Sequence, residues 1–359
     1  MPNTLPDPLA DASRRPTLRD VAAESGYHAT TVSKALRDHP SIPTETRQNI
    51  QAIAQRMGYE RNPVYYALSR FRNDKNHSAP GACIAYLENF GRGSGIIRLQ
   101  HRELILQGAQ NQAQLLGYKL EVISVGEDDH DTRSLTHHLR DQHIAGIVIG
   151  DFQPGCAEIA LNWDDFAVAK VNSRHTEPEA TVVSNDQLRE VRLSFRKLKA
   201  LGYQRIGLAI GRSDEDGCGH RHTAGYLMEA AALPEAQRVP PLLFPYNINE
   251  SALSAMLGRW VRRNAIDVVL CNWQNIADML RQAELKVPEQ VACANLCLCD
   301  TEEHYLAGVR PRLDLVGERA VSIVVAQLKS SILGLPEFPS SLYVQSDWQD
   351  GPSAPSRLA

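Results

Sequence analysis

The chain lacks the long apolar segments of a membrane or secreted protein. No run of 18 apolar residues occurs in its 359 residues, and its start, MPNTLPDPLADASRRP, has Pro and Asp where a signal peptide requires an apolar stretch. Aromatic residues make up 6% and charged residues 22%, near the globular averages. We expect a globular cytoplasmic protein of two or three domains with no membrane contact, and neither a fibrous nor a largely disordered chain.

Cysteine is scarce and shows neither a disulfide nor a zinc pattern. The seven cysteines are an odd number, and Cys83, Cys271 and Cys293 lie in apolar, strand-like runs that are typical of buried free thiols. Cys293, Cys297 and Cys299 form a C-x3-C-x-C cluster, but no partner group of His or Cys has the spacing of a zinc site. We therefore expect free thiols, no bound metal and no cofactor.

The common motifs of enzymes are also missing. No G-x-G-x-x-G follows a predicted strand, and no P-loop, G-x-S-x-G or H-E-x-x-H occurs. GRGSGI at 91–96 follows a strand but lacks the Lys and the third Gly of a phosphate loop, which favours a flexible loop over a cleft. The His and Asp residues show no spacing that indicates a catalytic triad. We predict that the protein is not an enzyme and has no catalytic residues.

Positive charge is concentrated near the beginning of the chain. Residues 14–76 contain eleven Lys and Arg against six Asp and Glu, whereas the whole chain has a net charge of −4. The remainder must therefore be acidic. This distribution is typical of a nucleic-acid-binding head joined to an acidic body.

Residues 17–59 show the pattern of three short helices. Thr17 is placed to cap the first helix, Asp20 favours its positive end, and Gly26 ends it. A second helix starts almost at once, and a third follows Pro43. The apolar stripes that we expect to face inward are Leu18, Val21 and Ala22, then Ala29, Val32 and Leu36, then Ile50, Ile53, Ala54 and Met57.

The second helix carries a polar side that suits DNA. Thr30, Ser33, Lys34 and Arg37 share one face at helical spacing. Two short helices joined by a Gly-bearing turn and braced by a third form a helix-turn-helix, whose second helix lies in the major groove. Periodicity by itself allows an alternative, in which these residues are only a solvated helix face.

TLRDVAAESGYHATTVSKALRDHPSIPTETRQNIQAIAQRMGY closely resembles the DNA-binding head of the LacI/GalR repressor family. The family's T-L-x-D-V-A, glycine turn, T-V-S-[RK]-x-[LV], T-R-x-x-[IV] and G-Y recur here in that order. The resemblance implies that Ala29 and Thr30 are the first base readers, and that Thr17, Thr31, Ser33 and Lys34 contact phosphates or bases. His28 replaces the usual capping Ser, where it can still cap or touch a phosphate, and Arg37 replaces the usual Asn, so the operator sequence does not transfer from a relative.

Residues 61–80 are expected to form a hinge and a linker. Asn62 and Pro63 can cap a helix of about two turns, which is too short to be stable alone. In the family this segment folds on DNA, and a leucine from each of two copies wedges into the minor groove; Leu68 falls in that place. Arg61 and Tyr65 depart from the family's Y-x-P-N-x-x-A. The alternative for Leu68 is ordinary core packing.

From residue 81 short apolar runs alternate with amphipathic segments. The predicted strands are ACIAYLE, KLEVISV, AGIVIG, FAVAKVN, RIGLAI, DVVLCNW and VACANL, and the predicted helices are 99–116, 132–142, 186–201, 221–232, 250–264 and 274–283. This alternation indicates parallel sheets covered on both faces. The two runs predict two similar subdomains with a cleft between them.

The body resembles the type I periplasmic-binding-protein fold of the same family. QGAQNQAQLLGYKL, FRKLKALGYQRIGL and LKVPEQVA occur in the expected order. We therefore expect an α-helical helix-turn-helix head plus an α/β periplasmic-binding-protein-like two-subdomain body. The expected divisions are a disordered tail at 1–15, the head at 16–60, the hinge and linker at 61–80, and the body at 81–350, with subdomains at 81–173 plus 300–332 and at 174–299 plus 333–350.

An effector pocket is expected beyond the carboxyl ends of the strands. This rule selects His101, Arg102, Asp151, Asn172, Ser173, Arg221, His222, Trp273, Asn295 and Cys297. By the resemblance, His222 stands at the family's usual Arg, with Arg221 adjacent, and Cys297 stands at its usual pocket Asp. Trp273 can stack on a sugar ring. The pocket chemistry suits a sugar or polyol, including one with an acidic group; the alternative for each residue is a cleft wall without a ligand.

We therefore predict a homodimeric transcriptional regulator that binds double-stranded operator DNA. Repressor is the favoured role and activator the alternative, because either follows from the position of the operator. A sugar-like effector in the cleft would change the angle between the subdomains and so the separation of the hinges. Residues 96–116 are expected to supply most of the dimer interface. The alternatives are a periplasmic-type solute-binding protein, which would have a signal peptide and no head, and a cleft enzyme acting on sugars, which would need paired carboxylates.

Overall fold

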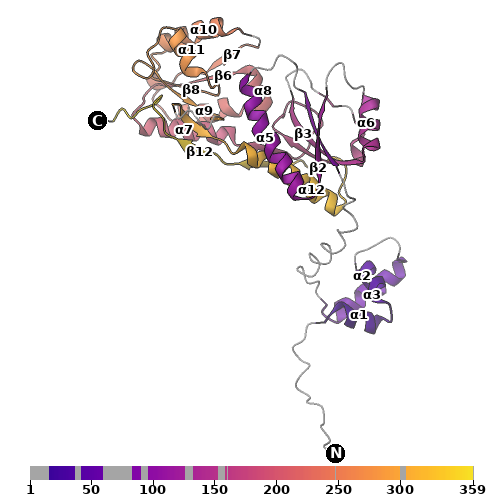
Figure 1. The fold of residues 1–359 in the computed structure, drawn as a ribbon. Coiled ribbons are helices and arrows are strands. Elements are labelled where there is room, and N and C mark those ends of the chain that lie inside the picture. Colours follow the sequence, from indigo (N-terminus) through magenta and orange to yellow (C-terminus); the bar gives the residue numbers. More distant parts are fainter. Residues whose placement is uncertain are drawn as a thin grey trace, which may run out of the picture. The chain divides into compact units, whose positions relative to one another are not determined.

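The computed structural model describes residues 16–36, 42–59, 83–89, 96–125, 132–152, 158–159, 161–246, 248–299 and 305–358. The chain divides into two compact units, Met1–Ala79 and Pro80–Ala359 (Figure 1). Several predictions lie outside the described residues: the tail at 1–15, most of the glycine loop at 91–96, and the roles of Arg37, Asn62, Tyr65 and Leu68. The side chains of Thr30, Ser33 and Asp151 are also outside the description.

The first unit contains the three predicted helices. They are α1 (Leu18–Ser25), α2 (Ala29–Ala35) and α3 (Thr44–Arg56). Thr17 and Asp20 form a reciprocal capping box, and Gly26 ends α1 in the left-handed conformation at φ 73°. The core of the head is Val21, Val32, Ala35, Ile50 and Ala54. Ala35 rather than Ala29 is the alanine of α2 that becomes fully buried, because α3 packs against the end of α2.

The first lobe of the body is a six-stranded parallel sheet in the order β11-β5-β4-β3-β1-β2. Its strands are β1 (Cys83–Asn89), β2 (Lys119–Ser124), β3 (Ile144–Phe152), β4 (Ala167–Val171), β5 (Val182–Asn185) and β11 (Ser341–Val344). Helices α5 (Ile96–Leu115) and α12 (Leu313–Ser330) cover one face. Helix α6 (Thr132–Asp141) covers the other, and a short 3-10 helix, η2 (Trp163–Asp165), precedes β4.

The second lobe has a sheet in the order β12-β10-β9-β8-β6-β7, in which only β12 is antiparallel. The strands are β6 (Ile206–Gly211), β7 (Leu242–Phe244), β8 (Val268–Cys271), β9 (Ala292–Asn295), β10 (Ala307–Arg310) and β12 (Asp347–Gln349). One face is covered by α7 (Gln187–Ala200) and α9 (Arg221–Ala231), the other by α10 (Glu250–Arg263) and α11 (Ile276–Gln282). A short helix, α8 (Arg212–Cys218), joins β6 to α9, and η3 (Glu235–Gln237) precedes β7.

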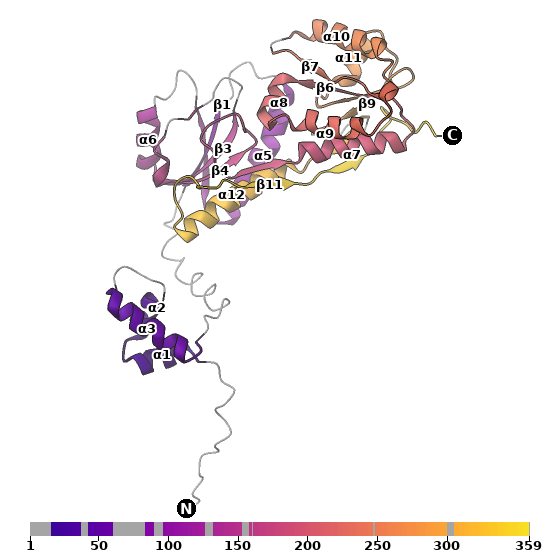
Figure 2. The same ribbon diagram turned by 180° about the vertical axis from the view of Figure 1, so that it is seen from behind.

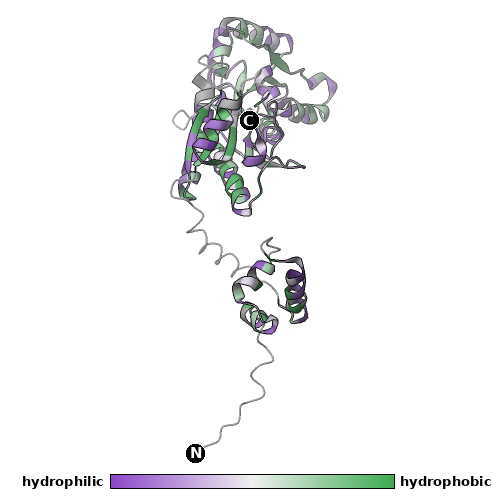
Figure 3. Ribbon diagram, turned by 90° about the vertical axis from the view of Figure 1, so that its right-hand side faces the viewer, coloured by the Kyte–Doolittle hydropathy of each residue, from purple (hydrophilic) through white to green (hydrophobic). Residues whose placement is uncertain are grey.

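Both sheets are therefore buried on both faces, as their apolar strands predict. The strands of the body are coloured mainly as hydrophobic in Figure 3. All seven predicted strands and all six predicted helices of the body are present, with ends that move by a few residues. Within the described residues no helix is both long and apolar enough to cross a membrane.

The division between the subdomains differs from the prediction. Strand β5 belongs to the first lobe, so the chain first crosses between lobes at residues 185–187 rather than near 173. Strand β10 belongs to the second lobe, and the chain returns at 310–313 rather than near 300. Strand β11 belongs to the first lobe, so the third crossing is at 344–347, with β12 following in the second lobe. The polar segment after β4 resembles a linker but is a loop within one sheet.

Two glycines allow α5 and α12 to cross closely (Figure 2). A Cβ at Gly317 would lie 1.9 Å from the carbonyl oxygen of Ile105, and a Cβ at Gly108 would lie 2.0 Å from that of Asp314. The backbones of α5 and α12 are therefore in direct contact at this crossing, and no larger residue fits at either glycine without separating the helices. The crossing fixes α12 over the first sheet, next to the point where the chain enters from the second lobe.

Candidate DNA-binding helix and effector cleft

Helix α2 starts with regular first-turn hydrogen bonds and is held at its end by α3. The carbonyl of His28 accepts hydrogen bonds from the N–H groups of Thr31 (2.8 Å) and Val32 (3.1 Å). At the other end, Gln51 Nε2 of α3 donates to the Ala35 carbonyl at 3.2 Å. This bond satisfies a carbonyl that the helix itself leaves without a partner.

The outer side of α2 faces solvent. Lys34 and His28 are exposed, and Ala29 and Thr31 are half-buried. The hydroxyl of Thr17, expected to contact DNA, donates to Asp20 Oδ2 at 2.7 Å and accepts from the Asp20 N–H at 3.4 Å. Thr17 therefore acts first as a helix cap. Among the described residues, exposed Lys34 and His28 are side chains that can contact DNA phosphates or base edges.

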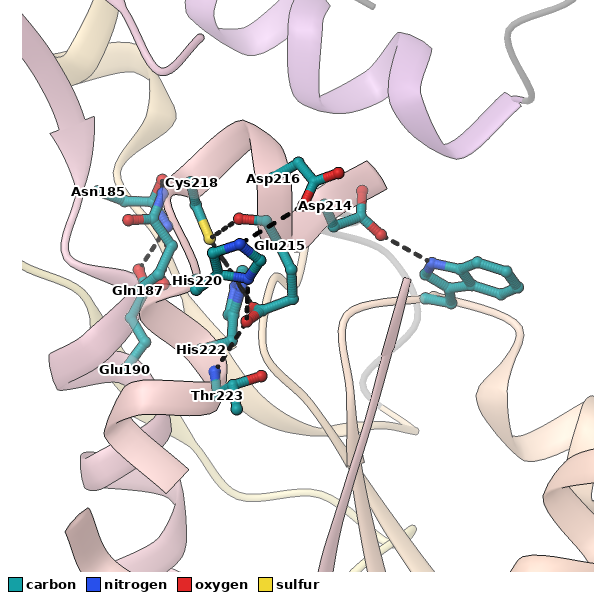
Figure 4. Close-up of polar contacts among 11 residues, drawn as sticks. Asn185, Gln187, Glu190, Asp214, Glu215, Asp216, Cys218, His220, His222 and Thr223 are labelled. Carbon is teal, nitrogen blue, oxygen red and sulfur yellow. Dashed lines mark hydrogen bonds and ion pairs between the residues drawn. The ribbon is translucent and has the colours of Figure 1, made fainter. Parts of the chain in front are cut away.

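Three buried side chains meet where α8 turns into α9 (Figure 4). His222 Nδ1 is 2.9 Å from Glu215 Oε1 and 3.3 Å from Cys218 Sγ. Glu215 Oε2 accepts from the Thr223 N–H at 3.2 Å. His222 was predicted at the site, whereas Glu215 and Cys218 were not; the spacing E-x2-C-x3-H was the available signal.

The charges in this group are coupled. Burial by itself lowers the pKa of His222, but Cys218 and Glu215 outweigh it and the pKa is raised well above its usual value. For Glu215, burial raises the pKa, but the hydrogen bonds from His222 and Thr223 outweigh burial and lower it. Glu215 and His222 therefore form a buried ion pair.

Arg221 links α9 to the crossings between the lobes. Its Nη2 donates to Asp186 Oδ1 at 2.8 Å, and its guanidinium lies 4.3 Å from the ring centroid of Tyr343 in β11. Arg174, in the loop after β4, donates to the Tyr343 hydroxyl at 3.0 Å, and its backbone N–H donates to the Gly217 carbonyl of α8 at 3.1 Å. The first lobe therefore touches α8 directly.

Glu190 is hydrogen-bonded to residues in two of the three segments that cross between the lobes. It is 2% exposed, and its carboxylate accepts two bonds from Asn185 Nδ2, at 2.8 and 2.7 Å, and one from Ser346 Oγ. Burial raises the pKa of Glu190, although the bonds from Ser346 and Asn185 oppose the rise. We call Asn185, Glu190 and Ser346 the crossing clamp. It was missed from sequence because its outer members are far apart in the chain.

The strand ends of the second lobe bring three more predicted residues to the site. Trp273 packs against Phe244, and its Nε1 donates to Asp214 Oδ2 of α8 at 3.3 Å. Asn295 is fully buried; its side chain donates to the Trp273 carbonyl at 2.9 Å and accepts from the Cys297 N–H at 2.7 Å. Asn295 therefore shapes the loop and does not present its amide to a ligand.

Cys297, which the family resemblance aligns with a pocket Asp, lies half-buried. Its Sγ is 3.5 Å from Cys299 Sγ, and the hydrogen bond with Cys299, together with burial, raises the pKa of Cys297 well above its usual value. Glu190 and Asp214 add to the rise, which places both carboxylates near the thiol. The thiol therefore stays neutral, and Cys297 cannot replace the carboxylate that its position would otherwise supply.

The predicted residues of the first lobe are mostly engaged within that lobe. Arg102 Nε donates to Glu88 Oε2 at 2.6 Å, and its Nη2 also bonds Glu88. Ser173 is buried; its hydroxyl donates to the Gly150 carbonyl at 2.8 Å and accepts from the Phe152 N–H at 2.9 Å. Asn172 is half-buried in a left-handed conformation beside it, and His101 is half-buried on α5.

Some buried polar atoms at the lobe boundary have no hydrogen-bond partner among the described residues. They are Gln187 Oε1 just after β5, Asn272 Oδ1 just after β8, and Arg221 Nε. One of the three is a donor and two are acceptors. A buried polar atom without a hydrogen bond destabilises the folded protein, and such atoms commonly mark a site for water or a ligand.

The head and the body together define a DNA-binding regulator with a two-lobed ligand-binding domain. The family described as bacterial regulatory proteins, lacI family, matches residues 17–62. The family described as periplasmic binding proteins and sugar binding domain of LacI family matches residues 103–293, more than half of the chain. The chain belongs to the LacI family of bacterial transcriptional regulators.

Individual relatives agree with this assignment. The regulator MalR of Streptomyces coelicolor is 25% identical over 87% of this chain and 90% of its own. The regulator PtxS of Pseudomonas plecoglossicida is 24% identical over 55% of this chain, and the match spans about half (54%) of PtxS.

Solved structures share the whole fold. A complex of the transcriptional regulator CelR with cellobiose has a TM-score of 0.56 at 16% identity, over 94% of this chain and 100% of CelR. The lac repressor dimer bound to operator and the anti-inducer ONPF has a TM-score of 0.54 at 16% identity, over 95% and 99%.

Proposed function

We propose that this protein is a homodimeric repressor that binds a specific operator in double-stranded DNA and is controlled by a small molecule held between its lobes. The observation that carries the proposal is the helix-turn-helix of α1 and α2 braced by α3, with Lys34 of α2 and the preceding His28 exposed. Because a regulator acts where the DNA is, the proposal places the protein in the cytoplasm. The operator-bound dimer of the lac repressor supports the same arrangement by analogy of fold.

In this proposal the start of α2 reads bases. Ala29 and Thr30 contact base edges, while Thr31, Ser33 and Lys34 contact bases or phosphates, with Thr17 and His28 at the flanks. A dimer places two copies of α2 in successive major grooves of a near-palindromic site. The hinge roles of Asn62, Tyr65 and Leu68, and the contact of Arg37, remain as the family resemblance implies.

For the effector we propose a sugar or related polyol. A hydroxyl group both donates and accepts, so a set of hydroxyls can bond Arg221 Nε, Asn272 Oδ1 and Gln187 Oε1. Trp273 offers an aromatic face at the same boundary, and His222 and Arg221 lie on α9 beside it. These groups belong to the second lobe and lie near its boundary with the first. A ligand that they hold and that also contacts the first lobe favours one angle between the lobes, and this shift is the basis of control in the proposal.

A gel-shift series tests the proposal. The full-length protein is incubated with a pool of random duplexes, and the retained sequences are measured again at several salt concentrations. We expect selection of a near-palindromic sequence and an affinity that falls steeply as salt rises. Absence of any sequence preference at low salt would refute the proposal. Sugars and sugar acids added to the selected complex should include at least one that releases it or strengthens it.

Lys34→Gln supplies the matched variant. It should weaken binding to all duplexes about equally and make the salt dependence shallower by roughly one unit of slope, because one phosphate contact is lost. Lys286→Gln, which removes an exposed lysine from the body, is the control and should change neither quantity. Equal weakening by both variants would show that α2 is not the helix that meets DNA.

A further inference from the structure

Glu215, Cys218 and His222 bring three kinds of metal-binding atom to one point. The carboxylate, the thiol and the imidazole come from a single segment of eight residues, at the end of α8 and the start of α9. Their exposed fractions are 1%, 5% and 7%. Among the described residues this is the group of His, Cys and acidic side chains that meets the spacing needed for an ion, with all ligand atoms within 4.8 Å of one another.

The separations match the edges of a small tetrahedron. Cys218 Sγ is 3.3 Å from His222 Nδ1 and 3.8 Å from Glu215 Oε1, while Nδ1 and Oε1 are 2.9 Å apart. A tetrahedral ion with bonds of about 2.0–2.3 Å separates its ligand atoms by roughly 3.3–3.8 Å. Two edges already have that length. The third distance, between Nδ1 and Oε1, must lengthen by about half an ångström when the hydrogen bond between these atoms is replaced by a bond from each atom to the metal.

The backbone holds the three groups in place without an ion. Gly219 (φ 68°) and His220 (φ 59°) are both left-handed, and this turn returns the chain so that α9 starts beside α8. The His220 N–H closes the turn on the Glu215 carbonyl at 2.7 Å. The Thr223 N–H orients the Glu215 carboxylate from outside the group, as the second layer around a metal site commonly does.

His220 provides a further ligand on the solvent side. Its Nδ1 lies 3.9 Å from Glu215 Oε2, and its side chain is 69% exposed, so it can rotate toward the group. His220 and His222 both approach the carboxylate of Glu215 (Figure 4). Either His220, whose Nε2 lies 3.6 Å from Asp216 Oδ1, or water can complete four-coordination.

We propose that Glu215, Cys218 and His222 bind one divalent transition-metal ion of the zinc type. Thiolate and imidazole ligands select such ions over Mg²⁺ and Ca²⁺, which prefer oxygen. On binding, the ion replaces the proton shared by His222 Nδ1 and Glu215 and the thiol proton of Cys218, and both protons pass to solvent. The bound ion cross-links α8 to α9, between Asp214, which bonds Trp273, and Arg221, which bonds Asp186.

Cobalt is the probe that tests the site. The full-length protein, stripped with a chelator and kept reduced, is titrated with Co²⁺, and bound metal is counted by elemental analysis. We expect one equivalent per chain, with the near-ultraviolet absorption of a cobalt–thiolate bond and the visible bands of tetrahedral cobalt. Zn²⁺ added afterwards should remove these bands by displacing the cobalt.

Two cysteine variants make the result specific. Cys218→Ser should abolish the cobalt–thiolate absorption, and the double variant Cys297→Ser/Cys299→Ser should retain it. The reverse pattern would overturn the proposal, because the neighbouring thiol pair would then be the ligand. Lack of any thiolate band in the parent protein would overturn it as well.

A stability measurement covers the case in which a variant folds poorly. Zn²⁺ should raise the melting temperature of the parent protein and of Cys297→Ser/Cys299→Ser, and should leave that of His222→Gln unchanged. Circular dichroism confirms the fold of each variant. The metal proposal does not rest on DNA binding, so a sample that selects an operator but binds no ion refutes the metal site alone.

Discussion

The two lobes of the body share one architecture but use the polar groups at their strand ends differently. In the first lobe, Ser173 bonds two backbone groups and Arg102 is paired with Glu88. In the second lobe, Glu215, Cys218 and His222 form a dense group with mixed chemistry beside the boundary. The polar groups of the first lobe therefore mainly stabilise that lobe, whereas the second lobe gathers titratable side chains at the boundary. One fold supports both because the segments that follow the strands, not the strands themselves, carry these groups.

The largest effect should come from breaking the scaffold of the first lobe. Gly317→Ala puts a Cβ against the Ile105 carbonyl and should lower the free energy of unfolding by about 3 kcal/mol. Gly225→Ala in the second lobe puts a Cβ 2.5 Å from the Leu188 carbonyl and should cost less, about 2 kcal/mol. Urea denaturation measures both.

The neighbouring substitution Glu318→Ala is the control for Gly317→Ala. It lies on the same helix and should change stability by less than about 0.5 kcal/mol. If Gly317→Ala were as mild as this control, α5 and α12 would not be in the close contact described here.

A second test concerns the crossing clamp between the lobes. Because burial raises the pKa of Glu190, the folded chain holds this proton more tightly than the unfolded chain does. The stability contributed by the group is greatest below the ordinary glutamate pKa of about 4.3 and falls as the pH rises through the raised value. Relative to Glu190→Gln, the parent protein should lose about 1.4 kcal/mol for each unit by which the pKa is raised.

Denaturation curves at a series of pH values measure this difference. Ser346→Ala removes a hydrogen bond that lowers the pKa of Glu190 and should therefore make the pH dependence of the parent steeper. Parallel stability profiles for the parent and Glu190→Gln would show that Glu190 ionises as easily in the folded chain as in the unfolded one.

The smallest effect concerns association of two copies. If α5 of the first lobe supplies the dimer interface, Leu104→Glu should weaken dimerisation about fivefold, close to 1 kcal/mol, because a charge replaces an exposed apolar side chain. Leu227→Glu, on α9 of the second lobe, is the matched control. Sedimentation equilibrium measures both, and a greater loss with Leu227→Glu would move the interface to the second lobe.

Much of the head could be predicted from sequence because its determinants are local. Thr17, Asp20 and Gly26 fix the ends of α1 through contacts within one or two turns, and the structure confirms each of them. The seven body strands that were predicted are apolar runs, which can be recognised from local sequence without knowing which strands they pair with. Strands β5, β7, β10, β11 and β12 were not predicted. Each has three or four residues and little contrast with the chain around it, whereas β8 and β9, with four residues each, lie in clearer apolar runs.

The candidate site was less predictable, because the partners of Glu190 and Trp273 come from distant segments and because Glu215, Cys218 and His222, although close in sequence, meet only through the left-handed turn at Gly219 and His220. The rule of strand ends selected His222, Trp273 and Arg221, which do lie at the lobe boundary. It also selected Ser173 and Asn295, whose side chains are occupied by backbone groups. No local pattern marks Glu190, since its role depends on Asn185 in one crossing and Ser346 in another.

The sequence by itself determined the order of the elements, the burial of both sheets and the polar side of α2, because helical and strand periodicity and helix caps act over a few residues. Only the tertiary structure decided which strands share a sheet, where the chain crosses between lobes, and which polar side chains meet. The physical reason is that a buried carboxylate, thiol or imidazole takes its charge and its partners from whatever packs against it. For Glu190 those partners, Asn185 and Ser346, come from two separate crossings between the lobes, whereas Glu215, Cys218 and His222 lie within eight residues and meet because the chain turns sharply at Gly219 and His220.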